Sequence, residues 1–264
     1  MSKQYDGIQE EYDDWRRGAD AEFEKENFLR TLVPLVKGAS VLELACGSGF
    51  YTFDLVSWGI AHSIHAVDVS PVMLSAAEAD PRRSRLPFPQ RVTFQAADVS
   101  VPQTFPAAPY DAVVAGWLLT YAPNRETLTR MLRTVHLNLK EGGLFVTTVI
   151  NPSSDPTKAF TDGTLAFWSP GAYRIEPLEP VADGVAIRCC ARSPSGKASE
   201  WRSFYLSREA YAAAARDAGF QQEIEYRRPL ALPEVADRHR PSAEIDALVA
   251  GLTKLHFHIL ILRK

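Results

Sequence analysis

The stretch VLELACGSGF, residues 41–50, decides the fold of this chain. An apolar run that contains one acid, Glu43, breaks into the turn CGSG at 46–49 and then becomes aromatic. A glycine loop after a buried strand is typical of sites for phosphates and other nucleotide-like ligands, because glycine lets the backbone approach the ligand closely. The stretch therefore predicts a buried strand over 40–45 and a ligand-binding loop directly after it.

The pattern that follows this loop alternates between strands and helices. We expect strands at 62–68, 91–96, 110–115 and 143–150, and helices at 50–58, 71–80 and 124–138. Ser70 before Pro71 is a favourable helix start, since serine caps the first turn and proline is tolerated in it. Such alternation indicates a mostly parallel sheet with helices on both faces.

The first 38 residues predict a helical cap. Tyr5, Ile8, Tyr12 and Trp15 recur at intervals of three and four residues, so a helix would bring them onto one face. A second helix is expected over 21–36.

The second half of the chain interrupts the alternating pattern. Residues 151–206 are rich in turns and in short strand segments separated by proline and glycine, which predicts a small β-rich insertion. A helix at 207–218, with Ser207 as its N-cap and Gly219 after its end, returns the chain to the core. Strands at 220–226 and 254–262 are expected to complete the sheet.

Composition limits the classes of partner. The chain has 264 residues and a net charge of −3 with no basic block, so we expect no nucleic-acid partner. The short basic cluster at 82–85 is interpreted as a solvated loop. We expect no membrane span, because there is no run of about 18 apolar residues, and the polar N-terminus does not resemble a secretory leader. Three cysteines do not make a disulfide framework, and together these features predict a cytoplasmic protein.

Two acids indicate which ligand the glycine loop holds. A dinucleotide fingerprint would carry glycine where this chain has Thr52, and the lysine of a Walker loop is absent. Asp68 closes the second strand, 21 residues after Gly47, where a carboxylate can accept hydrogen bonds from both ribose hydroxyls; the alternative is a cap on the next helix. Asp98 follows the third strand and can accept from the amine of a purine. The pattern favours an adenosine moiety without phosphates.

ELACGSGFYT, at 43–52, resembles motif I of the class I S-adenosylmethionine-dependent methyltransferases. The later motifs of that family resemble, in order, VDVS at 67–70, QAADV at 95–99, YDAVVAGWLLTYA at 110–122 and LNLKEGGLFV at 137–146. The resemblance implies S-adenosylmethionine as cofactor, S-adenosylhomocysteine as product, and an α/β, Rossmann-like doubly wound sheet of seven mostly parallel strands with an antiparallel last strand. It also implies a single domain over 1–264, with the helical cap at 1–38 and a substrate-covering insertion at 151–206.

Each motif position of the family assigns a residue of this chain to the site. As cofactor-binding residues the resemblance implies Tyr12, Glu43, Ala45, Gly47, Gly49, Asp68, Val69, Met73, Asp98, Val99, Gly116 and Trp117. Glu43 is expected to position the loop or the amino group of the ligand. Trp117 and Tyr121 follow the fourth strand beside the transferable methyl group, and we assign them the catalytic task of orienting the acceptor.

The chain is more narrowly similar to small-molecule N-methyltransferases of the toxoflavin type. The similarity lies in Tyr-Asp-x-Ile at the N-terminus, WLLTYA at 117–122 and Ser-Arg-Glu-x-Tyr before the late helix. A small planar heteroaromatic acceptor, methylated on nitrogen, is therefore expected, and aromatic side chains suit it because they stack on flat rings. The predicted acceptor-binding residues are Tyr5, Trp117, Tyr121, Trp168 and Tyr173. The alternative is that half of the aromatic residues build the core of the insertion, and that Tyr5 and Tyr12 fasten the first helix to the sheet.

Other acceptor classes lack their motifs in this chain. Enzymes that methylate amino groups of nucleic acids carry a Pro-Pro motif where this chain has Gly116-Trp117, and the acids of a catalytic metal site are missing. His256 and His258 share a strand face, but a pair without a third ligand favours a structural role over a metal site. O- or S-methylation, a non-catalytic adenosylmethionine-binding regulator and a dehydrogenase stay open as alternatives. So do the choice between monomer and homodimer and the general base, with candidates His136, Tyr121 and Asp155.

Overall fold

The computed structural model describes residues 4–162, 173–230, 232 and 256–264. Within them the strands form a seven-stranded main sheet and a three-stranded small sheet. The strands of the main sheet are β1 (Ala39–Leu44), β2 (Ala61–Asp68), β3 (Val92–Ala96), β4 (Tyr110–Ala115), β5 (Leu139–Ile150), β9 (Glu225–Arg227) and β10 (Phe257–Arg263). The small sheet contains β6 (Tyr173–Val181), β7 (Gly184–Arg192) and β8 (Ala198–Leu206).

The main sheet has the strand order β3-β2-β1-β4-β5-β10-β9. Strands β1 to β5 pair in parallel, whereas β10 runs antiparallel to both β5 and β9. This arrangement confirms the predicted α/β fold, with its mostly parallel sheet, antiparallel last strand and small β-rich insertion. The strand order reverses between β1 and β4, and a doubly wound sheet binds its ligand at such a reversal.

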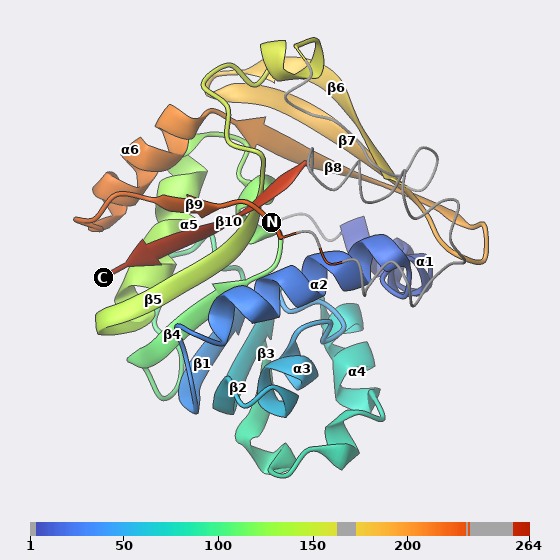
Figure 1. The fold of residues 1–264 in the computed structure, drawn as a ribbon, viewed down its shortest axis with the longest axis vertical. Helices are drawn as coiled ribbons and strands as arrows, with labels where there is room; N and C mark the ends of the chain where they lie inside the picture. The colour runs from blue at the N-terminus through green and yellow to red at the C-terminus, as the bar shows by residue number, and fades with distance from the viewer. Residues whose placement is uncertain (1–3, 163–172, 231, 233–255) are drawn as a thin grey trace.

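Helices cover both faces of the main sheet (Figure 1). They are α1 (Gln9–Trp15), α2 (Ala19–Leu32), α3 (Thr52–Ser57), α4 (Pro71–Ala79), α5 (Arg125–Asn138) and α6 (Arg208–Ala218), with 3₁₀ helices at Gln4–Gly7, Arg83–Arg85, Pro89–Arg91, Leu118–Tyr121 and Lys158–Phe160. Helices α2, α3 and α4 bury side chains such as Phe28 and Leu55 against one face, and α5 and α6 bury Leu132 and Ala214 against the other. Each face therefore has its own apolar core, which explains why the central strands are apolar throughout.

Side-chain caps fix where the helices begin and end. The Ser70 hydroxyl accepts a hydrogen bond from the Met73 amide at 3.1 Å, and the Ser207 hydroxyl caps α6 in the same way at 3.2 Å, as predicted. Gly219 ends α6 with a φ of +113°, a left-handed conformation that favours glycine. The Ser70 cap matters most for the site, because α4 begins directly after Asp68 at the ligand edge of the sheet.

Several boundaries differ from the predictions, and three of the differences have a plain physical reason. Residues Gln4–Gly7 form a 3₁₀ turn and α1 begins at Gln9, because Gly7 is a poor helix former. β5 begins at Leu139 instead of 143, since Leu139 already pairs with Tyr110 of β4. The strand expected over 220–226 shortens to β9, which pairs with β10 at the edge of the sheet, where short strands are common.

The small sheet and α1 share a third apolar core. Trp15 of α1 packs into it with Ile187 and Trp201 of the small sheet, and Tyr12 and Trp117 contact the same cluster. The N-terminal segment and the insertion are therefore held together beside the main sheet. In the part of the chain that the structure describes, every helix is too short or too polar to cross a bilayer.

Candidate functional site

The carboxyl ends of β1, β2 and β4 lie side by side where the strand order reverses. Leu44 of β1 pairs with Val67 of β2 on one side and with Ala115 of β4 on the other. The loops that follow these strands therefore leave the same edge of the sheet, and they bring together the glycine loop, Asp68 and Trp117. Open α/β sheets hold their ligands at such an edge.

The glycine loop is shaped for a close approach to a ligand. Gly47 has a φ of +56° and Gly49 a φ of +85°, both in the left-handed region that favours glycine. A Cβ added to Gly47 would meet open space, whereas a Cβ added to Gly49 would lie 2.7 Å from the ring of Phe53. Gly47 thus leaves room on the ligand side, and Gly49 lets the loop pack closely onto α3.

Asp68 supports the loop and also faces the ligand side. Its Oδ2 accepts a hydrogen bond from the Gly47 amide at 2.8 Å, and its Oδ1 accepts one from the Ser70 amide at 2.9 Å. Burial raises the pKa of this carboxyl, and the hydrogen bonds from Ser70 and Gly47 oppose that rise. A carboxylate offers about four acceptor positions, so the predicted contact with ribose hydroxyls stays a prediction that the geometry permits.

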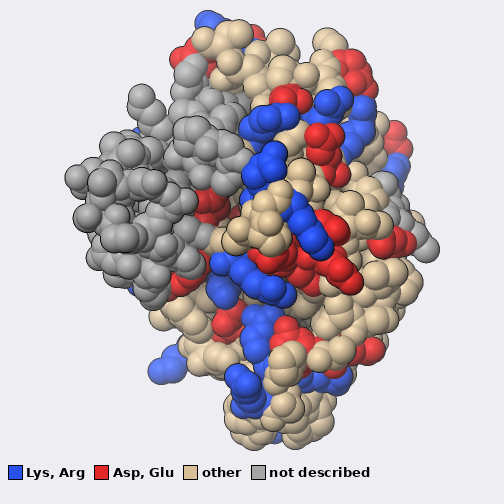
Figure 2. Space-filling model, turned by 90° about the vertical axis from the view of Figure 1, so that its right-hand side faces the viewer, with Lys and Arg blue, Asp and Glu red and all other residues tan. Residues whose placement is uncertain are grey.

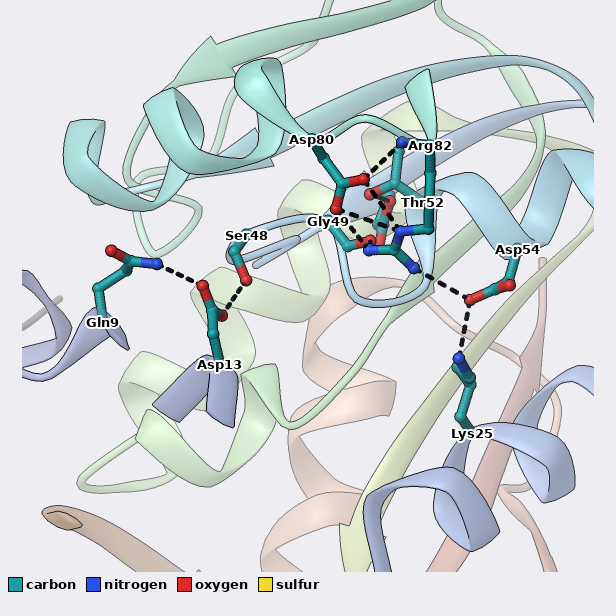
Figure 3. Close-up of polar contacts among 10 residues, drawn as sticks. Gln9, Asp13, Lys25, Ser48, Gly49, Thr52, Asp54, Asp80 and Arg82 are labelled. Carbon is teal, nitrogen blue, oxygen red and sulfur yellow. Dashed lines mark hydrogen bonds and ion pairs between the residues drawn. The ribbon is translucent and has the colours of Figure 1, made fainter. Parts of the chain in front are cut away.

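Side chains from two other segments hold the glycine loop from outside (Figure 3). The Ser48 hydroxyl is hydrogen-bonded to Asp13 of α1. From the loop after α4, the Arg82 guanidinium donates a hydrogen bond to the Gly49 carbonyl oxygen at 3.2 Å. The same guanidinium pairs with the Asp80 carboxylate at 2.9 Å. Arg82 therefore lies in a partly exposed loop, as expected for the basic cluster, and in addition it is paired with acids and bound to the glycine loop.

Glu43 lies behind the loop. It is 1% exposed and accepts a hydrogen bond from the Thr52 hydroxyl at 2.6 Å. Burial raises the pKa of Glu43 to about 8, so this side chain is protonated at neutral pH. Its contact with Thr52 fits a part in positioning the loop, and a contact with the amino group of a ligand stays a prediction.

A first cavity, which we call the loop cavity, opens beside the glycine loop. The predicted cofactor residues that line it are Tyr12, Ala45, Gly47, Asp68, Val69, Met73, Val99, Gly116 and Trp117. Glu43, Gly49 and Asp98 are not among its described lining residues. Oδ1 of the Asp98 carboxylate accepts hydrogen bonds from the amide of Ser100 at 2.8 Å and from its hydroxyl at 2.7 Å. The neighbours of Asp98 in sequence, Ala97 and Val99, line the cavity, and the contact of Asp98 with a purine amine stays a prediction.

Arg16, which the sequence patterns did not identify, also lines the loop cavity. Its side chain is 7% exposed, lies 3.1 Å from Glu24 and donates to the Tyr12 hydroxyl at 3.0 Å. The ring of Phe50 lies 4.3 Å from the guanidinium, a cation–π distance. A buried cation beside the glycine loop can bind an anionic end of a ligand. The spacing of Tyr12 and Arg16, four residues apart, was the sequence signal that places both on one side of the first helix.

A second cavity, which we call the aromatic cavity, adjoins the first. The described residues that bring rings to its wall are Tyr5, Tyr12, Trp15, Trp117, Tyr121, Tyr173, Trp201, His256 and Phe257. Both cavities share Tyr5, Tyr12, Trp117 and Tyr121. Four of the five predicted acceptor residues thus meet at this cavity, and the fifth, Trp168, lies outside the described residues.

Part of the aromatic set is also core, as the sequence alternative proposed. Tyr173 stacks on Trp15 with ring centroids 5.6 Å apart and ring planes 22° apart, and Trp201 is buried in the same cluster. Tyr205 and Phe160 pack on each other at 6.1 Å and are absent from the described linings of both cavities. The insertion therefore builds its own core and turns one side of that core toward the cavity.

The three candidates for a general base lie in different places. Tyr121 lies between the cavities with its hydroxyl hydrogen-bonded to that of Tyr5, and burial raises its pKa well above the usual value, so it is protonated at neutral pH. The His136 ring packs against the Phe220 ring, with ring centroids 5.1 Å apart. The Asp155 carboxylate accepts a hydrogen bond at 3.0 Å from the backbone amide of Lys158 in its own loop. His136 and Asp155 are absent from the described linings of both cavities, so neither is positioned to act on a ligand there.

Metal ligands do not cluster among the described residues: no three histidine, cysteine or acidic side chains come together there. His256 instead stacks on Trp117, with ring centroids 6.0 Å apart and ring planes 6° apart. His256 therefore has a packing contact of its own.

Charges of both signs mix on the surface. Figure 2 shows lysine and arginine side chains interspersed with aspartate and glutamate over the described part of one face. A face of this kind lacks the basic stripe that a nucleic-acid interface would carry.

Residues 41–143 match the family described as "Methyltransferase domain". A curated relative, the trans-aconitate 2-methyltransferase of Azoarcus sp. (strain BH72), is 30% identical over 154 residues. The match covers 57% of this chain and 55% of that protein, so the chain spans about half the length of this relative.

Solved structures share the fold over nearly the whole chain. The CcbJ methyltransferase from Streptomyces caelestis is 17% identical with a TM-score of 0.62, covering 100% of this chain and 99% of its own. The sugar N-methyltransferase KedS8 from Streptoalloteichus sp. ATCC 53650 is 21% identical with a TM-score of 0.55, covering 96% and 93%. The glycopeptide N-methyltransferase MtfA is 16% identical with a TM-score of 0.58, covering 91% and 89%. At these identities the likeness concerns the fold.

Proposed function

We propose that this chain, whose residues 41–143 match the methyltransferase-domain family, is a class I S-adenosylmethionine-dependent methyltransferase that transfers a methyl group to nitrogen of a small planar aromatic acceptor. The observation that carries the proposal is the pair of adjoining cavities, which share the rings of Trp117 and Tyr121. One cavity has the groups of a cofactor site, and the other has an aromatic wall. A donor and an acceptor held in them would meet at the shared rings.

The side chains of the loop cavity fit S-adenosylmethionine. Gly47 leaves room for its amino-acid part, and the buried cation of Arg16 suits the carboxylate. Asp68 suits the ribose hydroxyls, and the apolar side chains of Met73 and Val99 suit the faces of adenine. When bound, this cofactor supplies an electrophilic methyl group on a sulfonium sulfur.

The chain's own part in the reaction is to orient the acceptor and to exclude water. Trp117 and Tyr121 hold a flat ring by stacking, so that the acceptor nitrogen lies in line with the sulfur–methyl bond. Tyr5 and Tyr12 line both cavities from the N-terminal segment. We therefore assign residues 1–38 the role of a cap and residues 151–206 that of a cover over the acceptor, within one domain.

The aromatic cavity also argues against a non-catalytic regulator. A protein that senses S-adenosylmethionine needs the loop cavity alone, whereas this chain places a second cavity against it, with Trp117 in the walls of both. The same aromatic walls would also suit oxygen and sulfur acceptors of similar shape, so the acceptor atom is a matter for experiment.

The test combines calorimetry with a methyl-transfer screen. S-adenosylmethionine and NAD are titrated into the protein separately, and binding of NAD alone would contradict the proposal. The protein is then incubated with S-adenosylmethionine and one of five probes: aniline, 8-aminoquinoline, 2-naphthol, thiophenol or benzylamine. Mass spectrometry measures methylated product and S-adenosylhomocysteine.

We expect products from the aromatic nitrogen compounds. Products from 2-naphthol or thiophenol alone would move the function to O- or S-methylation. Tight cofactor binding without any product would favour the regulator.

A further inference from the structure

His256 lies immediately before the last strand of the main sheet, at the ligand edge. β10 runs antiparallel to β5, so its first residues lie beside the carboxyl end of β5. The His256 carbonyl oxygen accepts a hydrogen bond from the Asn151 amide at 2.7 Å. The imidazole ring stacks on Trp117 at 6.0 Å with nearly parallel planes. His256 therefore lies against the ring that both cavities share.

The imidazole of His256 also lines the aromatic cavity, where its centroid is 5.1 Å from that of Tyr173. The residue is 7% exposed, and its burial lowers the pKa of the imidazole to about 4. At neutral pH the ring is therefore uncharged, and an uncharged imidazole has one nitrogen able to accept a proton.

We propose that His256 accepts the proton that the acceptor nitrogen loses on methylation; this inference rests on the proposed function. Methylation of an N–H group forms a nitrogen–carbon bond while the methyl–sulfur bond breaks and leaves its electron pair on sulfur. As the nitrogen–carbon bond forms, the nitrogen gains positive charge and its proton becomes acidic. The proton passes to an imidazole nitrogen of His256 while the methyl group is transferred, and His256 later releases it to water.

Most of the other ionisable groups in the described wall of this cavity are less suited to the task. Four tyrosines stay protonated because burial raises their pKa values: Tyr5, Tyr12, Tyr121 and Tyr173. Burial also raises the pKa of Cys189 on β7 to about 12. Glu24 of α2 is paired with Arg16 at 3.1 Å. Asp20, also on α2, is a second potential base in the described wall, so the experiment must distinguish it from His256.

A weak base selects the class of acceptor. An aromatic amine is uncharged at neutral pH and attacks with a free lone pair, and its methylated nitrogen is far more acidic than an aliphatic ammonium. The acidity of that nitrogen is close to that of the His256 imidazolium, so its proton can pass to the imidazole. An aliphatic amine is protonated at neutral pH and would keep its proton against such a base. The inferred acceptor is therefore an aromatic amine or a heteroaromatic N–H group.

The first experiment compares three variants with aniline and 8-aminoquinoline as probes. His256→Phe keeps a ring against Trp117 but removes the proton acceptor, and His258→Phe is the matched control. His258 lies two residues further along the chain and is absent from the described linings of both cavities. We expect His256→Phe to lower kcat by about 100-fold or more, with S-adenosylmethionine affinity unchanged, and His258→Phe to keep kcat. Transfer that survives in His256→Phe but is lost in Asp20→Asn overturns the proposal.

Two further measurements separate a proton acceptor from a packing residue. In His256→Ala, added imidazole should restore turnover, and the restored rate should rise with pH as free imidazole loses its proton. In the ligand-free protein, the ring resonances of His256, assigned by their absence from the His256→Phe spectrum, should stay those of neutral imidazole from pH 6 to pH 8. Lost turnover without imidazole rescue, or a ring protonated at pH 7, overturns the proposal.

The two proposals fail in distinguishable ways. If the wild-type protein methylates none of the five probes, the proposed function fails and the role of His256 falls with it. If the wild-type protein and His256→Phe methylate aniline or 8-aminoquinoline equally, the proposed function stands and the role of His256 is overturned. A preference for benzylamine over aniline overturns the inferred acceptor class.

Discussion

The Oδ2 atom of Asp68 accepts the amide hydrogen of Gly47 at a donor–acceptor distance of 2.8 Å. One carboxylate therefore ties the end of β2 to the loop that follows β1, and it also lies in the wall of the loop cavity. Removing this carboxylate should weaken ligand binding in two ways, through the lost contact and through the altered loop.

Asp68→Ala should weaken S-adenosylmethionine binding by about 1.5–3 kcal/mol, the contribution of hydrogen bonds to a charged group. Isothermal calorimetry measures the effect. Asp111→Ala is the matched control, because that carboxylate accepts from the Ser40 amide at 2.8 Å and is absent from the described lining of the loop cavity. Equal affinities in wild type and Asp68→Ala would remove Asp68 from the site.

The features that the sequence predicted are local ones. A buried run, the glycine turn and the Ser70 cap each lie within a few consecutive residues, so their physical causes are visible in one stretch. The alternation of such stretches then implies the parallel sheet, and the parallel sheet brings Gly47 and Asp68 to one edge. That is why the fold and most of the loop cavity could be predicted.

Arg16 and His256 could not be found in this way, because each acquires its surroundings from distant segments. Arg16 is buried by Glu24 and Phe50, and His256 meets Trp117 only when the last strand is placed beside β5. Asp98 stands at a motif position, and its Oδ1 accepts hydrogen bonds within its own loop, so its contact with a purine amine stays a prediction.

Arg16→Gln should weaken S-adenosylmethionine binding by about 1.5–3 kcal/mol, because the buried guanidinium is positioned for the carboxylate of the ligand. Calorimetry with 5′-methylthioadenosine, which has no carboxylate, provides the discriminating measurement, since its affinity should not change. Arg17→Gln is the matched control, because the side chain of Arg17 is 75% exposed. If Arg16→Gln lowers the affinity for both ligands equally, Arg16 supports the fold of the cap and does not bind the carboxylate.

Glu43 should make the protein less stable as pH rises through neutrality. Burial raises its pKa from 4.5 to about 8 in the folded protein, so between these values the folded state holds a proton that the unfolded state has lost. The free energy of unfolding should fall by up to about 1.4 kcal/mol per pH unit in that window. Below pH 4.5, where Glu43 is protonated in both states, its stabilising contribution is fully present.

Urea unfolding at pH 5.5, 7 and 8.5 checks this expectation. Glu43→Gln keeps an acceptor for the Thr52 hydroxyl but cannot ionise, so its stability relative to wild type should increase with pH. Parallel pH profiles for the two proteins would show that Glu43 is ionised in the folded state.

Trp117 lines both cavities and stacks on His256, so its replacement tests the place where donor and acceptor are proposed to meet. Losing a stacking contact costs about 0.5–1.5 kcal/mol beyond area burial, and a misplaced ring can lose about a hundredfold in rate. Trp117→Ala should therefore lower kcat strongly and reduce S-adenosylmethionine affinity only modestly.

Steady-state kinetics and calorimetry on the same preparations separate the two effects of Trp117→Ala. Trp117→Phe keeps a flat ring and should retain more turnover than Trp117→Ala, because we expect ring stacking, and not side-chain volume alone, to hold the acceptor. Trp58→Ala serves as the control, since Trp58 is 40% exposed at the end of α3. Lost cofactor binding with normal acceptor kinetics in Trp117→Ala would make Trp117 a wall of the loop cavity alone. The acceptor would then have to be held by Tyr173 and Trp201 of the small sheet, and variants of these two residues should carry the loss of turnover instead.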